Sequence, residues 1–238
     1  MIMLNTQPTE KRVERVDGAL EIVGEPWLTL QGEGPFAGRP AVFVRLAGCN
    51  LQCGHPERNC DTDYTTGRRL LSVTDLAVLV ALVKPDGNYP LTVITGGEPF
   101  RQPLGPFVKD MLRAGYDVQL ETNGSLYDPS LVGAYGVISI VCSPKTPKLA
   151  TELLPYITAY KYVLDANHID LTDGLPLLTL GECRPARPHS GFSGEVYVQP
   201  LDAGDPEQNK RHADAAVTSC LKYGYRLSYQ LHKLLNLK

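Results

Sequence analysis

The chain has 238 residues, of which 43% are hydrophobic and 21% are charged, and its formal net charge is −3. This is the composition of an ordinary soluble globular protein, and its balanced charge gives no sign of the large basic surface that binds duplex nucleic acid. No apolar run approaches the length of about 18 residues that a membrane span needs, so we expect neither a nucleic-acid nor a membrane partner.

The N-terminal residues, 1–20, are rich in charge and lack the apolar region and small-residue cleavage site of a signal peptide. We interpret them as an extension, in part disordered, that precedes a single domain over residues 21–238. Without an export signal, we expect the protein to be cytoplasmic. In a reducing cytosol, clustered cysteines indicate metal binding or catalysis more than disulfide bonds.

Buried strands and helices alternate through this domain. Apolar, β-branched runs predict strands at residues 40–49, 90–99, 116–124, 135–145, 159–166 and 194–202. Capping signals and helical periodicity predict helices at residues 72–84, 103–115, 146–157 and 205–224, of which the third is weak. Residues 225–236 are expected to close the chain as a short strand with a tail.

This order of elements is typical of a parallel sheet covered by helices. About six strands are fewer than the eight of a complete (β/α)₈ barrel. We therefore expect an α/β fold, a partial (β/α) barrel of about six mostly parallel strands with helices outside.

Three of the six cysteines, Cys49, Cys53 and Cys60, lie in one short polar stretch. Thiolates bind soft or borderline metals, and three from one loop can cap an iron–sulfur cluster while leaving one iron open. Zinc would need a fourth ligand, for which His55 lies within the loop. The spacing Cys-x3-Cys-x6-Cys contains no Cys-x2-Cys pair, and on spacing alone a cluster and a zinc site remain alternatives.

Polar side chains follow successive predicted strands at their carboxyl ends. They are Gly96, Gly97 and Glu98 of "TGGEP", Glu121 of "ETNG", and Ser143 and Lys145 of "CSPK". A lone GGEP is more often an ordinary turn, although its glycines let backbone amides approach a ligand closely. Because parallel sheets bind ligands beyond the carboxyl ends of their strands, the recurrence of polar residues there indicates a binding site.

A glycine-rich segment, "LQGEG" at residues 30–34, precedes the cysteine loop. Gln31 and Glu33 can both accept hydrogen bonds, which suits a heterocycle edge with adjacent amino and ring N–H donors. Arg45 lies near the end of the next strand, where a guanidinium could hold a carboxylate through two hydrogen bonds. A flexible turn and a surface ion pair are the alternatives for these residues.

Together these motifs resemble the radical S-adenosylmethionine superfamily and, within it, the 7-carboxy-7-deazaguanine synthase family. Along residues 22–230 the resemblance is carried by "LQGEGPFAGRPAVFVRLAGCNLQC", "CDT", "TGGEP", "ETNG", "SPK", "YKYV" and "VQP". "LQGEG" and "CDT" are fairly specific to the family, whereas GGEP is shared across the superfamily. The resemblance implies a lyase that converts 6-carboxy-5,6,7,8-tetrahydropterin to 7-carboxy-7-deazaguanine with loss of ammonia, for queuosine or another 7-deazapurine.

The resemblance also implies the cofactors and their ligands. A [4Fe–4S] cluster is expected on Cys49, Cys53 and Cys60, with S-adenosylmethionine on its fourth iron, where reductive cleavage gives a 5′-deoxyadenosyl radical. Mg²⁺ is expected on Thr62, since a hard cation suits a hydroxyl and substrate oxygens rather than thiolates. The implied cofactor-binding residues are Gly96, Gly97, Glu98, Glu121, Ser143 and Lys145. The implied substrate-binding residues are Leu30, Gln31, Gly32, Glu33, Arg45, Gly97, Gln199 and Pro200. A reducing electron donor of the flavodoxin or ferredoxin type and a homodimer are the implied partners.

The cysteine spacing departs from the Cys-x3-Cys-x2-Cys that is usual in the superfamily, because six residues separate Cys53 from Cys60. We interpret "GHPE", residues 54–57, as an insertion within a cluster loop. Two rival functions remain: a radical S-adenosylmethionine activase that acts on a partner protein, and a zinc-stabilised binding module. An activase would lack the combination of "LQGEG" and Arg45, which favours the synthase.

Overall fold

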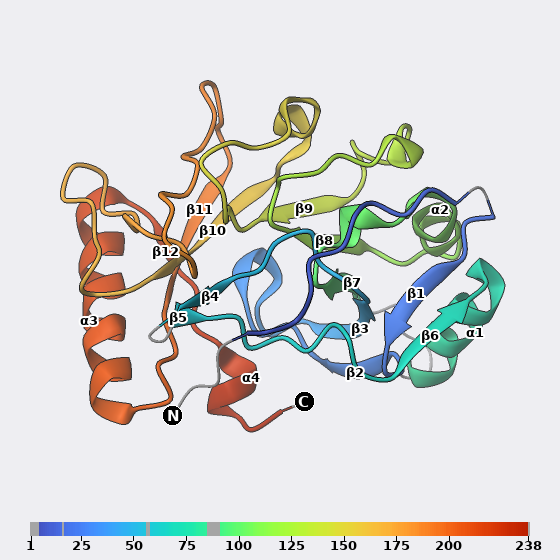
Figure 1. Cartoon of the computed structure of the whole chain (residues 1–238), viewed down its shortest axis with the longest axis horizontal. Helices are drawn as coiled ribbons and strands as arrows, with labels where there is room; N and C mark the ends of the chain where they lie inside the picture. Colours follow the sequence, from blue (N-terminus) through green and yellow to red (C-terminus); the bar gives the residue numbers. More distant parts are fainter. Residues whose placement is uncertain (1–4, 16, 56–57, 85–90, 238) are drawn as a thin grey trace.

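The computed structural model describes residues 5–15, 17–55, 58–84 and 91–237. The strands of its main sheet are β1 (Leu20–Val23), β2 (Trp27–Leu30), β3 (Pro40–Leu46), β6 (Arg68–Leu71), β7 (Leu91–Gly96), β8 (Val118–Thr122), β9 (Ser139–Cys142), β10 (Ala159–Leu164), β11 (Glu195–Pro200) and β12 (Arg226–Leu227). A separate hairpin consists of β4 (Gly54–His55) and β5 (Arg58–Asn59). The main sheet has the order β12-β11-β10-β9-β8-β7-β3-β1-β6, with β2 also paired to β3 (Figure 1).

Strand β3 and the strands β7 to β12 form one parallel series. Strands β1, β2 and β6 pair antiparallel with their neighbours. The six longer parallel strands, β3 and β7 to β11, coincide with the six strands predicted from the sequence. The expected α/β fold with an open, mostly parallel sheet is therefore confirmed.

Three helices, α1 (Val73–Val83), α2 (Gly105–Arg113) and α3 (Pro206–Tyr223), match sequence predictions. Local capping sets two of their starts: the Ser72 hydroxyl accepts the Asp75 N–H (3.1 Å) and the Asp205 carboxylate accepts the Gln208 N–H (2.8 Å). Figure 1 shows α1 and α2 beside one end of the sheet and α3 beside the other. These helices cover the outer face of the sheet, as in a partial barrel.

Two predicted elements differ in the structure. The weak helix at 146–157 is only a 3₁₀ helix over Thr151–Tyr156, because Pro155 has no N–H to donate to an α-helical turn. The closing strand at 225–236 is reduced to the two residues of β12, followed by the short helix α4 (Leu231–Leu234). The chain leaves the sheet there because the Leu231 N–H donates to the Gly32 carbonyl (3.1 Å) beyond β2.

The two faces of the parallel sheet have different chemistry. Ile94, Leu120 and Ile140 lie in register on β7, β8 and β9 and are fully buried in the main hydrophobic core. Successive strand residues point to opposite faces, so Gln119 and Glu121 on β8 face the other way. The polar inner face of the strands is where a site can form.

The described part of the N-terminal segment differs from the expected disordered extension. Residues 5–13 run along the cysteine loop, with a bridge between Thr9 and Cys49 and a hydrogen bond from the Glu10 N–H to the Cys49 carbonyl (2.7 Å). Figure 1 shows this segment, in dark blue, crossing from beside β4 and β5 to beside α2 before β1 begins. Order here follows from polar side chains that satisfy backbone groups of an irregular loop.

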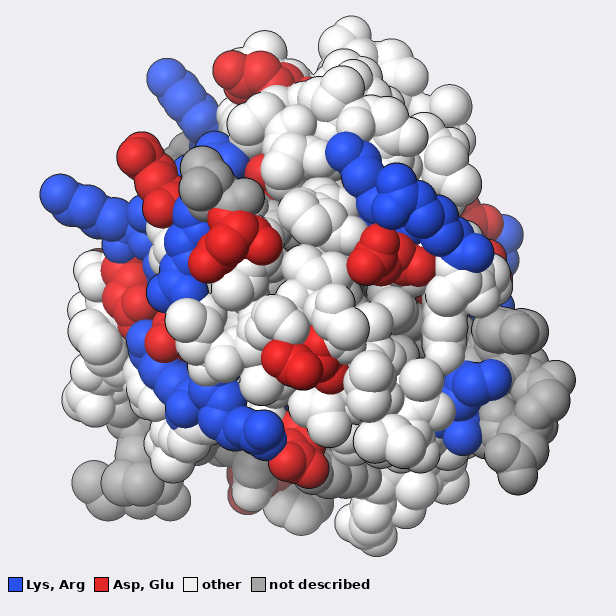
Figure 2. Space-filling model, turned by 90° about the vertical axis from the view of Figure 1, so that its right-hand side faces the viewer, with Lys and Arg blue, Asp and Glu red and all other residues white. Residues whose placement is uncertain are grey.

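The surface carries charges of both signs. Figure 2 shows Lys and Arg side chains interspersed with Asp and Glu on the side of the molecule that carries α1, α2 and β6, in line with the formal net charge of −3. Among the described residues, no helix has the length and apolar character needed to cross a membrane.

Candidate active site

A cavity of about 340 Å³ opens at the carboxyl ends of the parallel strands. Cys49 follows β3, Gly97 follows β7, Asn123 follows β8 and Ser143 follows β9, and all four line it. The polar residues that the sequence places after successive strands are thus brought together in one site, as the topology of a parallel sheet requires.

The three clustered cysteines line this cavity together. Cys49 is buried and Cys53 and Cys60 are half-buried, and all six cysteines of the chain are free thiols. Burial raises the pKa of the Cys49 thiol to about 12 and also raises the pKa of Cys53 and Cys60. Hydrogen bonds from Thr62 oppose this rise in the pKa of Cys60. Buried thiols of this kind become thiolates when a metal group replaces their protons.

The longer spacing between Cys53 and Cys60 has a structural explanation. The described residues between them, 54–55 and 58–59, form the strands β4 and β5, in which Gly54 pairs with Asn59. The Cys60 N–H also donates to the Cys53 carbonyl (3.4 Å), so the two cysteines lie side by side at the base of the hairpin. Two residues of the proposed insertion, 56 and 57, lie outside the described residues. The pairing of β4 with β5 therefore leaves Cys53 and Cys60 adjacent despite the longer spacing.

The described cysteines do not form a site for one metal ion. Within residues 5–15, 17–55, 58–84 and 91–237, no group of three or more His, Cys, Asp or Glu side chains is placed to hold a single ion.

Two glycines form a cradle beside Cys49. A Cβ on Gly96 would lie 2.2 Å from the Leu46 carbonyl oxygen, and one on Gly97 would lie 2.1 Å from the Gly48 carbonyl oxygen and 2.8 Å from the Cys49 Cβ. Gly96 also has φ of 142°, which favours glycine. Only glycine permits this close approach of the β7 end to the cysteine segment, and it leaves backbone on the cavity wall.

Glu98 is turned away from the cavity. Its fully buried carboxylate accepts hydrogen bonds from the Phe100 N–H (3.0 Å), the Thr122 hydroxyl (2.7 Å) and the Asn123 N–H (2.7 Å). Burial raises the pKa of Glu98 to about 7. In this arrangement Glu98 ties the end of β7 to the end of β8 and positions the cradle rather than lining the cavity.

A charged network forms another part of the cavity wall. Lys161 on β10 pairs with Glu33 and, at 3.6 Å, with Glu121. Gln31 donates to Glu121 (3.0 Å), and Gln230 donates to Glu33 (2.8 Å). Burial alone would raise the pKa of Glu33, but the charge and hydrogen bond of Lys161 lower it to about 2. The network therefore offers fixed carboxylate acceptors to a ligand with N–H donors.

Two further polar groups on the cavity wall lack a partner. The buried Nε of Arg45 and the buried Oε1 of Gln199 make no hydrogen bond within the protein. The Arg45 guanidinium lies 5.3 Å from the ring centroid of Trp27, which fixes its plane. Buried polar atoms without partners are costly, so these two are expected to be satisfied by a ligand.

Curated relatives align along nearly the whole chain. The 7-carboxy-7-deazaguanine synthase of Rhodospirillum rubrum is 43% identical over 230 residues, which cover 93% of this chain and 94% of the relative. That of Rickettsia prowazekii is 34% identical over 231 residues, covering 93% of this chain and 91% of the relative. The chain belongs to the 7-carboxy-7-deazaguanine synthase family. No family model matches it.

A solved structure has the same fold. The crystal structure of QueE from Escherichia coli superposes with a TM-score of 0.65 at 22% identity and covers 89% of this chain and 94% of that chain. This likeness supports the partial-barrel architecture over almost the full length.

The 7-carboxy-7-deazaguanine synthase family is a radical S-adenosylmethionine family that uses a [4Fe–4S] cluster, S-adenosylmethionine and Mg²⁺. The described residues fit these groups. Three free thiols line one cavity, the glycine cradle of Gly96 and Gly97 leaves backbone exposed beside them, and the hydroxyl-bearing Thr62 follows Cys60.

Most of the site residues expected from the family resemblance line the one cavity. They are Cys49, Cys53, Cys60, Thr62, Leu30, Gln31, Glu33, Arg45, Gly96, Gly97, Glu121, Ser143, Lys145 and Gln199. Gly32, Glu98 and Pro200 do not line it. Gly32 packs against His232, where a Cβ would lie 2.2 Å from the ring Nδ1, and Pro200 lines a separate depression beside α4. The ligands that each of these residues contacts remain predictions.

The cavity also has lining residues that were not predicted as site residues, among them Lys161, Gln230 and His232. Lys161 carried a signal, because a lysine inside the apolar run "AYKYVL" is expected to be buried only if it has an anionic partner. Gln230 and His232 carried no such signal, since α4 brings them to the cavity only through its contact with the segment after β2.

Proposed function

We propose that this chain is a 7-carboxy-7-deazaguanine synthase, a radical S-adenosylmethionine lyase that converts 6-carboxy-5,6,7,8-tetrahydropterin to 7-carboxy-7-deazaguanine with loss of ammonia. The observation that carries the proposal is one cavity that is lined both by three thiols and by the network of Lys161, Glu33 and Glu121. The product would serve queuosine or other 7-deazapurine biosynthesis.

The residues on the thiol wall would hold the cofactors. Cys49, Cys53 and Cys60 would bind the cluster, and Gly96 and Gly97 would present backbone to the methionine moiety of S-adenosylmethionine. Glu121, Ser143 and Lys145 would contact the same cofactor or the substrate. When bound, the cluster and S-adenosylmethionine supply the radical that starts the reaction.

The residues of the charged network and its neighbours would bind the substrate. Ionised Glu33 and the carbonyl oxygen of Gln31 can accept hydrogen bonds from the amino and ring N–H groups of a pterin. Arg45, whose Nε has no protein partner, would bind the carboxylate, and the Thr62 hydroxyl would hold Mg²⁺ close to it. The unsatisfied Oε1 of Gln199 would accept a further substrate N–H.

The oligomeric and cellular context is proposed from the family resemblance. We expect a cytoplasmic homodimer in which residues 21–238 form a single domain and a flavodoxin- or ferredoxin-type protein donates the electron. Light scattering on the purified protein would report the dimer, and turnover supported by a reduced flavodoxin would report the donor.

The proposal is tested by anaerobic reconstitution with iron and sulfide, followed by reduction and assay with and without the carboxypterin. We expect the broad brown absorbance of an iron–sulfur cluster and a deazaguanine product that requires both S-adenosylmethionine and the pterin. Cys53→Ser should abolish both, whereas Cys220→Ser, on the outer helix α3, should not. A colourless protein that retains one zinc ion would indicate the binding module instead. Cofactor cleavage that required a polypeptide and not the pterin would indicate the activase.

A further inference from the structure

The N-terminal segment contacts the backbone at Cys49, at Cys53 and two residues after Cys60. The Glu10 N–H donates to the Cys49 carbonyl (2.7 Å), and the Asn5 side-chain amide donates to the Cys53 carbonyl (3.2 Å). The Gln7 side-chain amide donates to the carbonyl of Thr62 (2.8 Å), two residues after Cys60. One short segment, residues 5–13, therefore joins parts of the loop that are separated in sequence; we call it the strap.

The strap also holds the hairpin and the end of the loop. The Asn5 N–H donates to the Asn59 side chain (2.9 Å) on β5, which fixes the inserted hairpin beside Cys53. The Oε1 of Gln7 accepts the Tyr64 N–H (2.8 Å) and the Thr65 hydroxyl (3.2 Å). A side chain that donates on one side and accepts on the other constrains the loop more than a single hydrogen bond.

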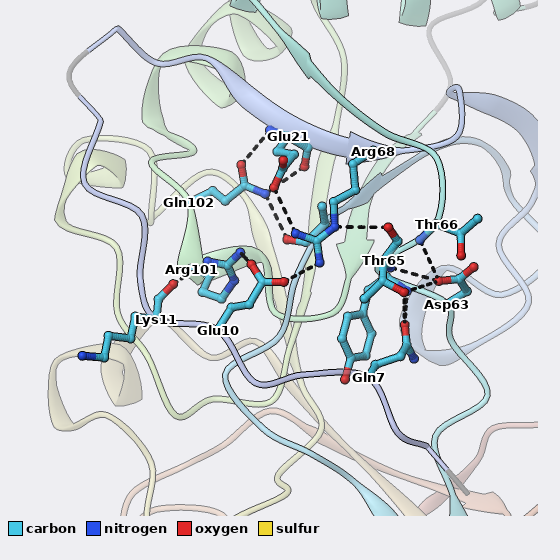
Figure 3. Close-up of polar contacts among 12 residues, drawn as sticks. Gln7, Glu10, Lys11, Glu21, Asp63, Thr65, Thr66, Arg68, Arg101 and Gln102 are labelled. Carbon is cyan, nitrogen blue, oxygen red and sulfur yellow. Dashed lines mark hydrogen bonds and ion pairs between the residues drawn. The ribbon is translucent and has the colours of Figure 1, made fainter. Parts of the chain in front are cut away.

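An ion-pair network anchors the strap to the body of the protein. Figure 3 shows the Glu10 carboxylate between two arginines: it pairs with Arg68 after the loop and with Arg101 (2.6 Å) after the glycine cradle. The Arg101 side chain is only 2% exposed and also donates to the Lys11 carbonyl. A buried guanidinium that lost Glu10 would be left unpaired, so this contact resists separation of the strap.

Arg101 of this ion-pair network also lies against the residue that precedes Cys49. A Cβ on Gly48, the residue before Cys49, would lie 2.1 Å from Nη2 of Arg101. The guanidinium that binds the strap therefore also supports the backbone on which Cys49 sits.

The loop itself has little regular structure to maintain its shape. Between Cys49 and Gly67, the described residues form only the two-pair hairpin of β4 and β5. Hydrogen bonds from outside the loop must then fix the backbone that carries the thiols.

We propose that the strap, residues 5–13, is part of the cluster site: Asn5, Gln7 and Glu10 are positioning residues that hold the three cysteine-bearing backbone segments in the geometry that binds the cluster. This inference rests on the proposed function, because it requires that Cys49, Cys53 and Cys60 bind the cluster. It assigns a role to a segment that precedes the sheet and carries none of the family motifs.

The test measures cluster retention in reconstituted protein under anaerobic, native conditions. Gln7→Ala and Asn5→Ala are expected to release iron to a chelator at least about fivefold faster than wild type, since each loses more than one hydrogen bond and a single one is worth about 1 kcal/mol. Gln7→Glu keeps the size and the acceptor of the side chain but loses the donor to Thr62, so it should also release iron faster. Thr6→Ala, at an exposed position of the same strap, is the matched control and should behave as wild type.

Two further readouts separate positioning from general stability. The electron paramagnetic resonance spectrum of the reduced cluster should change in Gln7→Glu and not in Thr6→Ala. The thermal midpoint of unfolding of cluster-free Gln7→Ala should fall only a little. The fall should be smaller than a general loss of stability would need to explain the faster release of iron. Iron release that is unchanged in Asn5→Ala and Gln7→Ala, or that rises only in proportion to lost thermal stability, would overturn the inference. Failure of wild type to bind a cluster would instead overturn the proposed function.

Discussion

The ammonium of Lys161 on β10 pairs with the carboxylate of Glu33, which lies 128 positions earlier in the chain, beyond β2. Both side chains are nearly buried, with 7% and 13% of their surfaces exposed. The pair joins the first glycine-rich motif of the chain to the middle of the parallel sheet. It therefore forms part of the wall of the cavity that the cysteines also line.

Replacing the lysine of this pair should destabilise the protein. In Lys161→Met, Glu33 and Glu121 would lose their common cation, and breaking a buried pair costs about 3–5 kcal/mol. Urea unfolding of cluster-free protein measures the change in the free energy of unfolding. Lys148→Met, at an exposed lysine, is the control, and the double variant Lys161→Met, Glu33→Gln should recover part of the loss. Equal stability of Lys161→Met and wild type would contradict the ion-pair role.

The same pair predicts a defined acid dependence. Because Lys161 outweighs the effect of burial, the pKa of Glu33 falls from 4.5 to about 2. A carboxyl whose pKa is lowered by folding stabilises the native state fully above its unfolded pKa and loses this contribution as the pH falls towards the folded pKa. The stability difference between wild type and Glu33→Gln should therefore shrink as the pH falls from 4.5 towards about 2. Urea titrations of both proteins across this range measure it, and a constant difference would exclude the effect.

Arg45 should control substrate affinity without controlling cofactor cleavage. Arg45→Ala is expected to weaken carboxypterin binding by about 2–5 kcal/mol, the usual range for truncating one partner of a buried charge pair. Calorimetry with the reconstituted enzyme and S-adenosylmethionine measures the affinity, and methionine release without substrate measures cleavage. Arg113→Ala, on the exposed surface of α2, is the control. Undiminished pterin affinity in Arg45→Ala would remove the residue from the substrate site.

The glycine cradle should not tolerate a side chain. In Gly97→Ala, the new Cβ would lie 2.1 Å from the Gly48 carbonyl oxygen, so the cysteine segment or the end of β7 must shift. We expect a large loss of S-adenosylmethionine binding, measured by equilibrium dialysis, and a lower thermal midpoint. Gly136→Ala, where no atom lies within 4 Å of the added Cβ, is the matched control. Wild-type cofactor binding in Gly97→Ala would show that the cradle can relax.

Local sequence signals predicted much of this protein correctly. The six longer parallel strands were recognisable because strands buried in a parallel sheet are rich in apolar and β-branched residues, as "AVFV" in β3 illustrates. The starts of α1 and α3 were recognisable from Ser72 and Asp205, since capping involves only the first turn of a helix. Motifs that follow the strands predicted several residues of the cavity wall, such as Gly97 and Ser143, because the carboxyl ends of parallel strands share one edge.

Other features depend on contacts between distant segments. The sequence could not show that the Glu98 carboxylate points away from the cavity. Its partners Thr122 and Asn123 lie at the end of the neighbouring strand β8 and just after it. The short helix α4, which brings Gln230 and His232 to the cavity, depends on a hydrogen bond between Leu231 and Gly32. The order of the N-terminal strap likewise depends on groups that lie more than 40 positions away, such as the Cys53 carbonyl bonded by Asn5.

The sequence by itself determined the family, the six longer parallel strands, the helices α1, α2 and α3, and the clustering of the three cysteines, because each is encoded in short motifs or in local periodicity. Only the tertiary structure decided how the thiols are held. The hairpin of β4 and β5 places Cys53 beside Cys60, and the strap binds the loop from outside. The physical reason is that an irregular loop satisfies its backbone with whichever donors the fold brings near, and sequence spacing does not identify those donors.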